Sequence, residues 1–300
     1  MSSTPEGSSD ARARVGYLGP AGTFSEEALL ASAAADAVEP VALASIYDTV
    51  TALRRDEVRW ALVPIENSLE GSINVTLDLL AGEASDDVEI VGETVLRVSH
   101  ALIAAAATPL EEIETVITHP QVPGQCTRIM RGELSGARVL PASSTAEAVR
   151  AVVAEDRRGQ AAIGTVLAAR IYAGTVLRAG IEDRADNETR FVWLARAAAE
   201  GADRDAPPLR VLAREWKTSL VFWGAGAERP GWLVRCLDEL ARRDINLTKI
   251  ESRPRREWLG SYMFFADVAG RADDPLVAEA IARIRAMCEQ VIVLGSYGAA

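Results

Sequence analysis

One stretch of the sequence joins polar side chains that could do chemistry to an apolar run that is expected to be buried. It reads DNETRFVWL over residues 186–194. A guanidinium beside a buried strand is costly unless a carboxylate or phosphate meets it. The Thr189 hydroxyl can give or take one hydrogen bond where charge changes. On these residues alone, the start of a strand with a solvated Arg190 is the simpler interpretation. The rest of the chain has to show whether this stretch belongs to a functional site.

A second group of polar side chains follows an apolar strand expected at residues 60–65. Glu66, Asn67 and Ser68 come at its carboxyl end, which is the edge where open α/β sheets bind ligands. Turn and capping chemistry explains Ser68 and, a little further on, Ser72, but it explains Glu66 less well.

A third candidate site lies at residues 19–23, which read GPAGT between an expected strand and a helix. Thr23 and Glu26 have the spacing of a capping box. The free N–H groups of such a helix start can hold an anion. The glycines match neither the dinucleotide fingerprint nor the P-loop, so we expect no nucleotide.

The elements that carry these groups repeat one order of strand, polar loop and helix. Strands are expected at 15–18, 40–44 and 60–65, then at 115–118, 137–140 and 161–163, with a β-rich run at 88–106 between the sets. This order predicts two small parallel-sheet lobes whose polar loops face each other across a cleft. A strand at 189–195 would return to the first lobe and put Thr189 and Arg190 in the cleft. His100, inside the β-rich run, is expected to be structural.

The order changes after a linker at residues 197–214, whose first part is rich in alanine, glycine, aspartate and proline. Strands are expected at 217–223, 246–251, 262–268 and 291–294, and helices at 231–243 and 274–289. The resulting βαββαβ order is the ferredoxin-like arrangement. Such a unit exposes a sheet edge and usually pairs with a copy of itself, so we expect a homo-oligomer.

Composition excludes several classes of partner. The net charge of −11 over 300 residues argues against nucleic acid, so an anionic ligand must be held locally by helix N-termini and single arginines. Three distant cysteines and two histidines give no metal-ligand spacing, so we expect no metal and a reducing, cytoplasmic location. Residues 1–14 are expected to be a disordered tail rather than a signal peptide, and no apolar run is long enough for a membrane span.

Together these motifs resemble the prephenate dehydratases of phenylalanine biosynthesis, in the form that carries a C-terminal ACT regulatory domain. The resemblance covers nearly everything from Val15 to Tyr297. It rests on the order and spacing of GPAGTFS from Gly19, PIENS from Pro64, HPQ from His119, SST from Ser143, TRF from Thr189, TKIESRP from Thr248 and GSYMFF from Gly260.

The resemblance implies a two-lobed, periplasmic-binding-protein-like α/β catalytic domain at residues 15–196 and a ferredoxin-like ACT domain at residues 215–298. Lobe one would hold residues 15–95 and 185–196, and lobe two residues 96–184. The implied reaction converts prephenate to phenylpyruvate, CO2 and water, and aromatisation drives it without a cofactor. The implied partners are prephenate, phenylalanine as an effector, and further copies of the chain in a dimer or tetramer formed through the ACT domain.

The resemblance also assigns roles to single residues. Thr189 would donate a hydrogen bond to the departing hydroxyl, and Arg190 would bind a substrate carboxylate. Because a threonine hydroxyl is a weak acid, we hypothesise that Glu66 supplies the proton if burial keeps it protonated. Asn67 and Gln121 complete the implied catalytic set. The implied substrate-binding residues are Thr23, Ser25, Ser68, Ser72, His119, Ser144, Thr145 and Phe191.

The implied phenylalanine site lies in the ACT domain, where Trp232 stands in place of a small residue. Overpacking a formed pocket typically costs about 1–3 kcal/mol. Three outcomes are open: Trp232 turns outward and leaves the site alone, reshapes it for another effector, or fills it and abolishes feedback. The implied effector-binding residues are Gly231, Trp232, Leu233, Val234, Asn246, Leu247, Glu251, Ser252, Arg253 and Pro254.

Two other functions stay open at this level. Arogenate dehydratase carries out the same chemistry on the transaminated substrate, and nothing in the sequence separates the two substrates. A two-lobed clamp is also the shape of solute-binding proteins, so a non-catalytic amino-acid sensor is the alternative from another class. The lack of an expected signal peptide and the intact TRF motif at residues 189–191 argue against the sensor.

Overall fold

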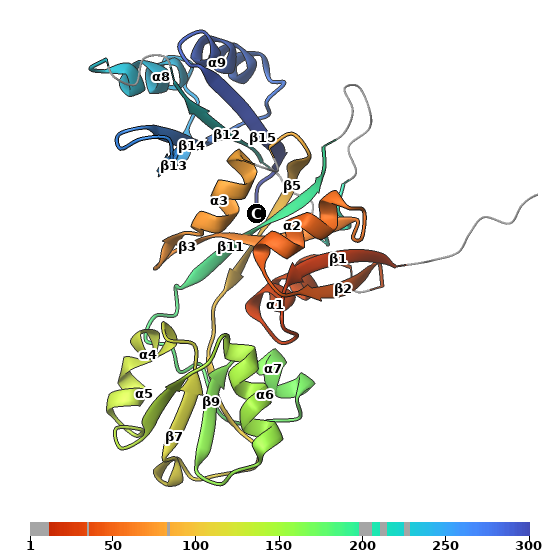
Figure 1. Ribbon diagram of the computed structural model, residues 1–300, viewed down its shortest axis with the longest axis vertical. Coiled ribbons are helices and arrows are strands. Elements are labelled where there is room, and N and C mark those ends of the chain that lie inside the picture. Colours follow the sequence, from red (N-terminus) through yellow and green to blue (C-terminus); the bar gives the residue numbers. More distant parts are fainter. Residues whose placement is uncertain (1–11, 35, 83–84, 198–205, 211–214, 225–228) are drawn as a thin grey trace, which may run out of the picture.

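The computed structural model describes residues 12–34, 36–82, 85–197, 206–210, 215–224 and 229–300. Three sheets organise the described residues, and they follow one another along the long axis of the molecule (Figure 1). The predicted fold class, a two-lobed α/β unit joined to a ferredoxin-like domain, is confirmed. Most of the expected tail and most of the expected linker lie outside the described residues.

The first sheet forms lobe one and has the strand order β2-β1-β3-β11-β5, with the short β4 paired to β3. Strands β1, β2 and β3 run parallel, whereas β11 is antiparallel to both β3 and β5. The predicted parallel sheet is therefore wrong in part, because the returning strand inserts in the opposite direction. The elements are β1 (Ala13–Leu18), α1 (Phe24–Ser32), β2 (Val38–Leu43), α2 (Ile46–Arg54), β3 (Trp60–Asn67), β4 (Gly71–Ser72), α3 (Asn74–Ala81), β5 (Val88–Arg97) and β11 (Glu188–Arg196).

The second sheet forms lobe two and has the order β10-β6-β9-β7-β8. Strands β7, β8 and β9 are parallel, and β6 and β10 are antiparallel to their neighbours. Strand β10 was not predicted, because most of its side chains are exposed and give no apolar run. The elements are β6 (Ala101–Ala104), the 3-10 turn Leu110–Glu112, β7 (Thr115–Thr118), α4 (Val122–Gln125), α5 (Thr127–Arg131), β8 (Arg138–Pro141), α6 (Thr145–Glu155), β9 (Gln160–Gly164), α7 (Val166–Ile171) and β10 (Thr175–Ala179).

The third sheet is antiparallel and has the order β13-β14-β12-β15, as the βαββαβ pattern predicts. Two helices pack on one face of it, and the opposite face lies on lobe one (Figure 1). The elements are β12 (Trp216–Trp223), α8 (Trp232–Ala241), β13 (Leu247–Pro254), β14 (Tyr262–Ala269), α9 (Pro275–Arg285) and β15 (Gln290–Gly298).

The C-terminal domain is joined to lobe one by a continuous apolar core. Val221 and Phe265 of the third sheet belong to the same buried cluster as Leu77 and Ile90 of lobe one. Strand β15 approaches β5 so closely that a Cβ at Gly295 would lie 2.1 Å from the Ile90 carbonyl oxygen. Only glycine fits there, so the two units are packed as one body rather than tethered.

Candidate active site

A cavity of about 340 Å³ lies between the two lobes of the catalytic unit. This volume falls within the range of small-molecule sites. Its walls come from the carboxyl end of β3, the starts of α1 and α6, the loop after β7, and β11. Eight of the expected site residues line it: Thr23, Ser25, Asn67, His119, Gln121, Ser144, Thr145 and Thr189.

Thr189 is held in this cavity by Asn67, its direct cross-strand partner. Asn67 Nδ2 donates to Thr189 Oγ1 at 2.9 Å and to Asn187 Oδ1 at 2.8 Å. Asn67 Oδ1 accepts from the N–H groups of Leu69 and Glu70, both at 2.9 Å, which fixes the amide orientation. Because Thr189 Oγ1 accepts from Asn67, its own proton is free to be donated to a ligand in the cavity.

Two helix N-termini, one from each lobe, point at the cavity. Thr23 caps α1 by accepting from Glu26 N, and Ser144 caps α6 by accepting from Glu147 N at 3.0 Å. The N–H groups that precede the first intrahelical bond have no helical partner, and the helix dipole makes this end attractive to an anion. Thr23, Ser25, Ser144 and Thr145 therefore lie where two carboxylates of one ligand could bind.

Arginine and lysine are absent among the described residues that line the cavity. The carboxylate there belongs to Glu70, which accepts from Gln121 Nε2 at 3.3 Å and from Gln125 Nε2 at 3.2 Å. These hydrogen bonds connect lobe one to lobe two. Anion binding in the cavity must therefore depend on N–H and hydroxyl donors rather than on side-chain cations.

Five polar residues of the cavity wall were not among the expected site residues: Glu70, His100, Gln125, Ser143 and Asn187. His100 is buried, its Nε2 lies 3.0 Å from Gln125 Oε1, and its ring meets Phe24 edge-on at 5.4 Å. Burial lowers the pKa of His100, and the hydrogen bond with Gln125 only partly opposes this. His100 is thus a neutral hydrogen-bonding residue of the wall. The spacing of Gln121 and Gln125, one helical turn apart, was the signal that could have found Gln125.

Arg190 and Glu66 do not reach the cavity, so their expected roles as substrate ligand and proton source do not fit the structure. Side chains alternate between the two faces of a strand. Thr189 and Asn67 occupy the face toward the cavity, and Arg190 and Glu66 occupy the face toward the C-terminal domain. Glu66 pairs there with Lys249 at 2.9 Å and with Arg190 at 3.3 Å.

Three other expected substrate ligands also lie outside the cavity. Ser68 Oγ accepts from Glu188 N at 3.0 Å and serves the turn. Ser72 belongs to β4 rather than to the start of α3, and it contacts Lys249 and Glu251 of the C-terminal domain. Phe191 is buried in the core of lobe one.

Trp232 turns into the core of the C-terminal domain, which none of the three expected outcomes described. It is 4% exposed, packs against Phe222 and Phe264, and donates from Nε1 to the Met287 carbonyl at 2.8 Å. A cavity of about 400 Å³ remains open beside it, lined in part by Gly231, Leu233, Val234 and Tyr262.

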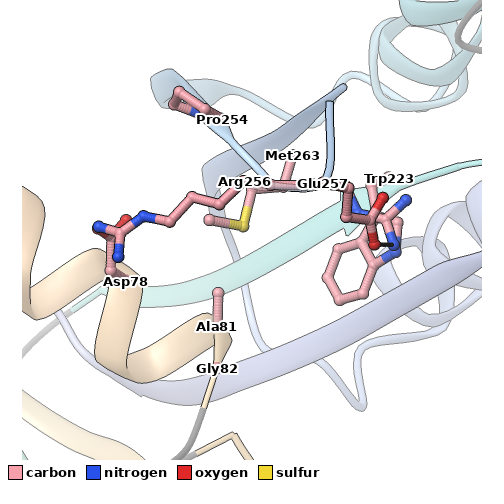
Figure 2. A pocket seen from close by; sticks show the side chains of 9 residues that line it. Asp78, Ala81, Gly82, Trp223, Pro254, Arg256, Glu257 and Met263 are labelled. Atoms are coloured by element: carbon pink, nitrogen blue, oxygen red, sulfur yellow. Dashed lines mark hydrogen bonds and ion pairs between the residues drawn. The ribbon is translucent and has the colours of Figure 1, made fainter. Parts of the chain in front are cut away.

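Glu251 and Arg253 of the expected effector motif face lobe one within one chain. Glu251 accepts from Ser72 Oγ at 3.1 Å, and Arg253 forms a two-pronged ion pair with Asp78 of α3. Ser252 is exposed, and Pro254 lines a separate cavity of about 310 Å³ between α3 and the C-terminal domain (Figure 2). The structure therefore splits the expected effector residues between two sides of β13.

The fold and the cavity define a class: a two-lobed α/β clamp around a cavity that carries hydroxyl and amide groups, packed against a ferredoxin-like domain. The family model described as "Prephenate dehydratase" matches residues 15–199, and the ACT domain model matches residues 226–286. The chain belongs to the prephenate dehydratase family.

Relatives and solved structures agree with this placement. A prephenate dehydratase of Mycolicibacterium vanbaalenii is 38% identical over 296 residues, covering 94% of this chain and 90% of the relative. The crystal structure of prephenate dehydratase from Arthrobacter aurescens in complex with L-Phe matches with a TM-score of 0.83 at 32% identity, covering 95% of this chain and 90% of that one. A structure described as "a novel type of quorum quenching acylases" matches with a TM-score of 0.80 at 26% identity, covering 96% and 98%.

Proposed function

We propose that this protein converts prephenate to phenylpyruvate, CO2 and water, under feedback from phenylalanine. Residues 15–196 are the proposed catalytic domain and residues 215–298 the proposed regulatory domain, and the proposed location is the cytoplasm, in keeping with a biosynthetic role. The observation that carries the proposal is the Thr189 hydroxyl, fixed by Asn67 and free to donate between two helix N-termini.

The arrangement suits a dianionic substrate that loses two groups at once. The starts of α1 and α6 hold the two carboxylates from opposite lobes, which places the ring between them. The C–C bond to the ring carboxylate breaks, its electrons complete the aromatic ring, and the C–O bond breaks to release hydroxide. Thr189 stabilises the departing hydroxide with a hydrogen bond, and the hydroxide takes up a proton to leave as water.

The absence of side-chain cations among the described wall residues fits the decarboxylation half of this reaction. Fixed N–H groups can hold a carboxylate without the strong ion pair that would stabilise its charge in the ground state. Charge disperses into the ring as CO2 leaves, so a weakly held carboxylate reacts more readily than one paired with arginine.

The acylase described for one structural neighbour requires an activated nucleophile. In the described part of this chain, neither His100 nor His119 is hydrogen-bonded to a serine or threonine hydroxyl. The geometry therefore favours dehydration over acyl transfer.

Phenylalanine is proposed to bind at the cavity beside Trp232, with a second copy of the chain completing the site. Strand β13 is an edge of its sheet, and Val234 and Ile250 nearby are 68% and 44% exposed. Exposed apolar side chains beside an unpaired strand edge favour pairing with another copy. A homodimer, or a tetramer built from it, follows as a proposal.

The test is turnover of prephenate by the purified full chain, followed by the absorbance of phenylpyruvate, with and without phenylalanine. Thr189→Val keeps the side-chain shape and removes the donor, so kcat should fall by about 10²- to 10³-fold. Thr108→Val, in the loop after β6 and outside the cavity, is the matched control and should keep wild-type kcat. Turnover of arogenate but not prephenate would move the assignment to arogenate dehydratase, and turnover of neither would favour a sensor.

A further inference from the structure

Arg190 lies at the centre of a cluster of six charges between lobe one and the C-terminal domain. Its Nη2 lies 2.7 Å from Asp267 Oδ2, its Nη1 3.0 Å from Glu93 Oε2, and its Nε 3.3 Å from Glu66 Oε2. The three carboxylates come from three strands: β3, β5 and, in the C-terminal domain, β14. We call this group the Arg190 cluster; its members are Arg190, Glu66, Glu93, Lys217, Lys249 and Asp267.

The cluster balances its own charge, and all of its members except the partly exposed Glu66 are largely buried. Lys217 Nζ lies 2.6 Å from Glu93 Oε1, and Lys249 Nζ lies 2.9 Å from Glu66 Oε1, so three cations face three anions. The side chains of Glu93 and Asp267 are 2% and 7% exposed. Removing one partner from such a group leaves a buried charge uncompensated, which makes each member's position matter to the others.

Asp267 is itself fixed from within the C-terminal domain. Its Oδ1 accepts from Ser219 Oγ at 2.6 Å, and Ser219 Oγ lies 2.6 Å from the hydroxyl of Tyr297. Burial raises the pKa of Tyr297, so the hydroxyl stays neutral and able to donate. Asp267 therefore presents Oδ2 to Arg190 from a rigid support.

The pairing of β11 with β3 is irregular next to Arg190. The β11–β3 register shifts between Arg190 and Phe191, where Ile65 of β3 is passed over. A register shift of this kind interrupts the β11–β3 ladder and bends the strand beside Arg190, while Thr189 and Arg190 stay paired in register with Leu96 and Val95 of β5. Arg190 and Thr189 are neighbours on opposite faces of β11, so the ion pairs that hold Arg190 against the C-terminal domain are made by the same strand segment that carries the Thr189 hydroxyl.

We propose that Asp267 is a positioning residue for the dehydration: it acts from the C-terminal domain, through Arg190, to hold the Thr189 hydroxyl at the departing group. The inference rests on the proposed function. It gives Arg190 of the TRF motif a task other than binding substrate, and it makes the catalytic geometry depend on how the regulatory domain sits.

The first measurement compares Asp267→Asn with wild type in the full chain. The amide keeps the shape and the bond to Ser219 but loses the charge that Arg190 meets. A displacement of about 1 Å at a reacting group can cost about 10²-fold, so we expect kcat to fall about 10- to 100-fold while KM stays close to wild type. Substrate binding is spared because the helix N-termini are untouched.

The matched control is Asp78→Asn, which breaks another ion pair between lobe one and the C-terminal domain. Asp78 on α3 pairs with Arg253 at 3.0 Å and with Arg256 at 2.5 Å, as Figure 2 shows for Arg256. This pair lies away from β11, so kcat should stay at the wild-type value. An equal fall of kcat in both variants would show that loosened domain docking is the cause and would overturn the inference.

A double-mutant cycle tests whether Asp267 acts through Arg190. Once Arg190→Gln has removed the guanidinium, Asp267→Asn should lower kcat little further. Additive losses would overturn the inference.

A second variant is needed if Asp267→Asn does not fold, which near-ultraviolet circular dichroism would reveal. Ser219→Ala then serves as the test, because it removes only the hydrogen bond to Asp267 Oδ1. An unchanged kcat in Ser219→Ala would overturn the inference. If the wild-type protein is inactive on prephenate, the proposed function is refuted. If the wild type is active and Asp267→Asn has the same kcat, only this inference is refuted.

Discussion

Trp232 offers the sharpest test of how the C-terminal domain is built. Its ring is 4% exposed between Phe222 and Phe264, and its Nε1 donates to the Met287 carbonyl, which ties the start of α8 to the turn after α9. Replacing a buried tryptophan by alanine typically costs about 3–5 kcal/mol. Trp232→Phe keeps most of the ring contacts and loses the hydrogen bond, so it should cost about 1–2 kcal/mol.

The assay is urea unfolding followed by circular dichroism, with isothermal titration of phenylalanine on each variant. Trp232→Phe should still bind phenylalanine, because the cavity of about 400 Å³ lies beside the ring rather than being filled by it. Leu276→Ala is the matched control, since that side chain on α9 is 55% exposed and its loss should change stability little. A Trp232→Ala variant as stable as wild type would refute the burial, and gain of phenylalanine binding only in Trp232→Ala would show that the ring blocks the site.

Three further outcomes follow from the contacts. Glu66→Gln should leave the acid limb of the pH–kcat profile unchanged, because Glu66 faces Lys249 and not the cavity; a shifted limb would restore Glu66 as the proton donor. Burial lowers the pKa of His100 in the folded chain, so the unfolded chain binds that proton more tightly. Stability should therefore fall as pH drops below about 6.5, the pKa in the unfolded chain. The melting temperatures at pH 7.5 and pH 5 should differ less in His100→Gln than in wild type. Gly295→Ala should destabilise by about 3 kcal/mol or more through its clash with the Ile90 carbonyl, while Gly136→Ala, with open space around it, should not; equal melting temperatures would contradict the close packing of β15 on β5.

Local sequence patterns predicted much of the fold. The cap at Thr23 stands at the start of α1 as expected, and Ser45 and Ser144 cap α2 and α6 in the same way, because a short polar side chain satisfies the free N–H groups of a first turn wherever the helix lies. The direction of β11 and the presence of β10 did not follow from local pattern, since strand direction depends on pairing partners distant in sequence.

The candidate site, like the fold, was predictable from the sequence only in part. The sequence placed Asn67 at the end of a strand, Thr189 at the start of one and Thr23 at the start of a helix, and the repeated order of strand, polar loop and helix predicted two lobes whose polar loops face each other across a cleft. The sequence could not determine which face of β3 and β11 each side chain occupies. Neighbouring side chains of a strand point to opposite faces, but the pattern does not show which of the two faces lies toward the cleft. The docking of the C-terminal domain decided it: Asp267 and Lys249 supply opposite charges on one face, so Arg190 and Glu66 point there and Thr189 and Asn67 point into the cavity.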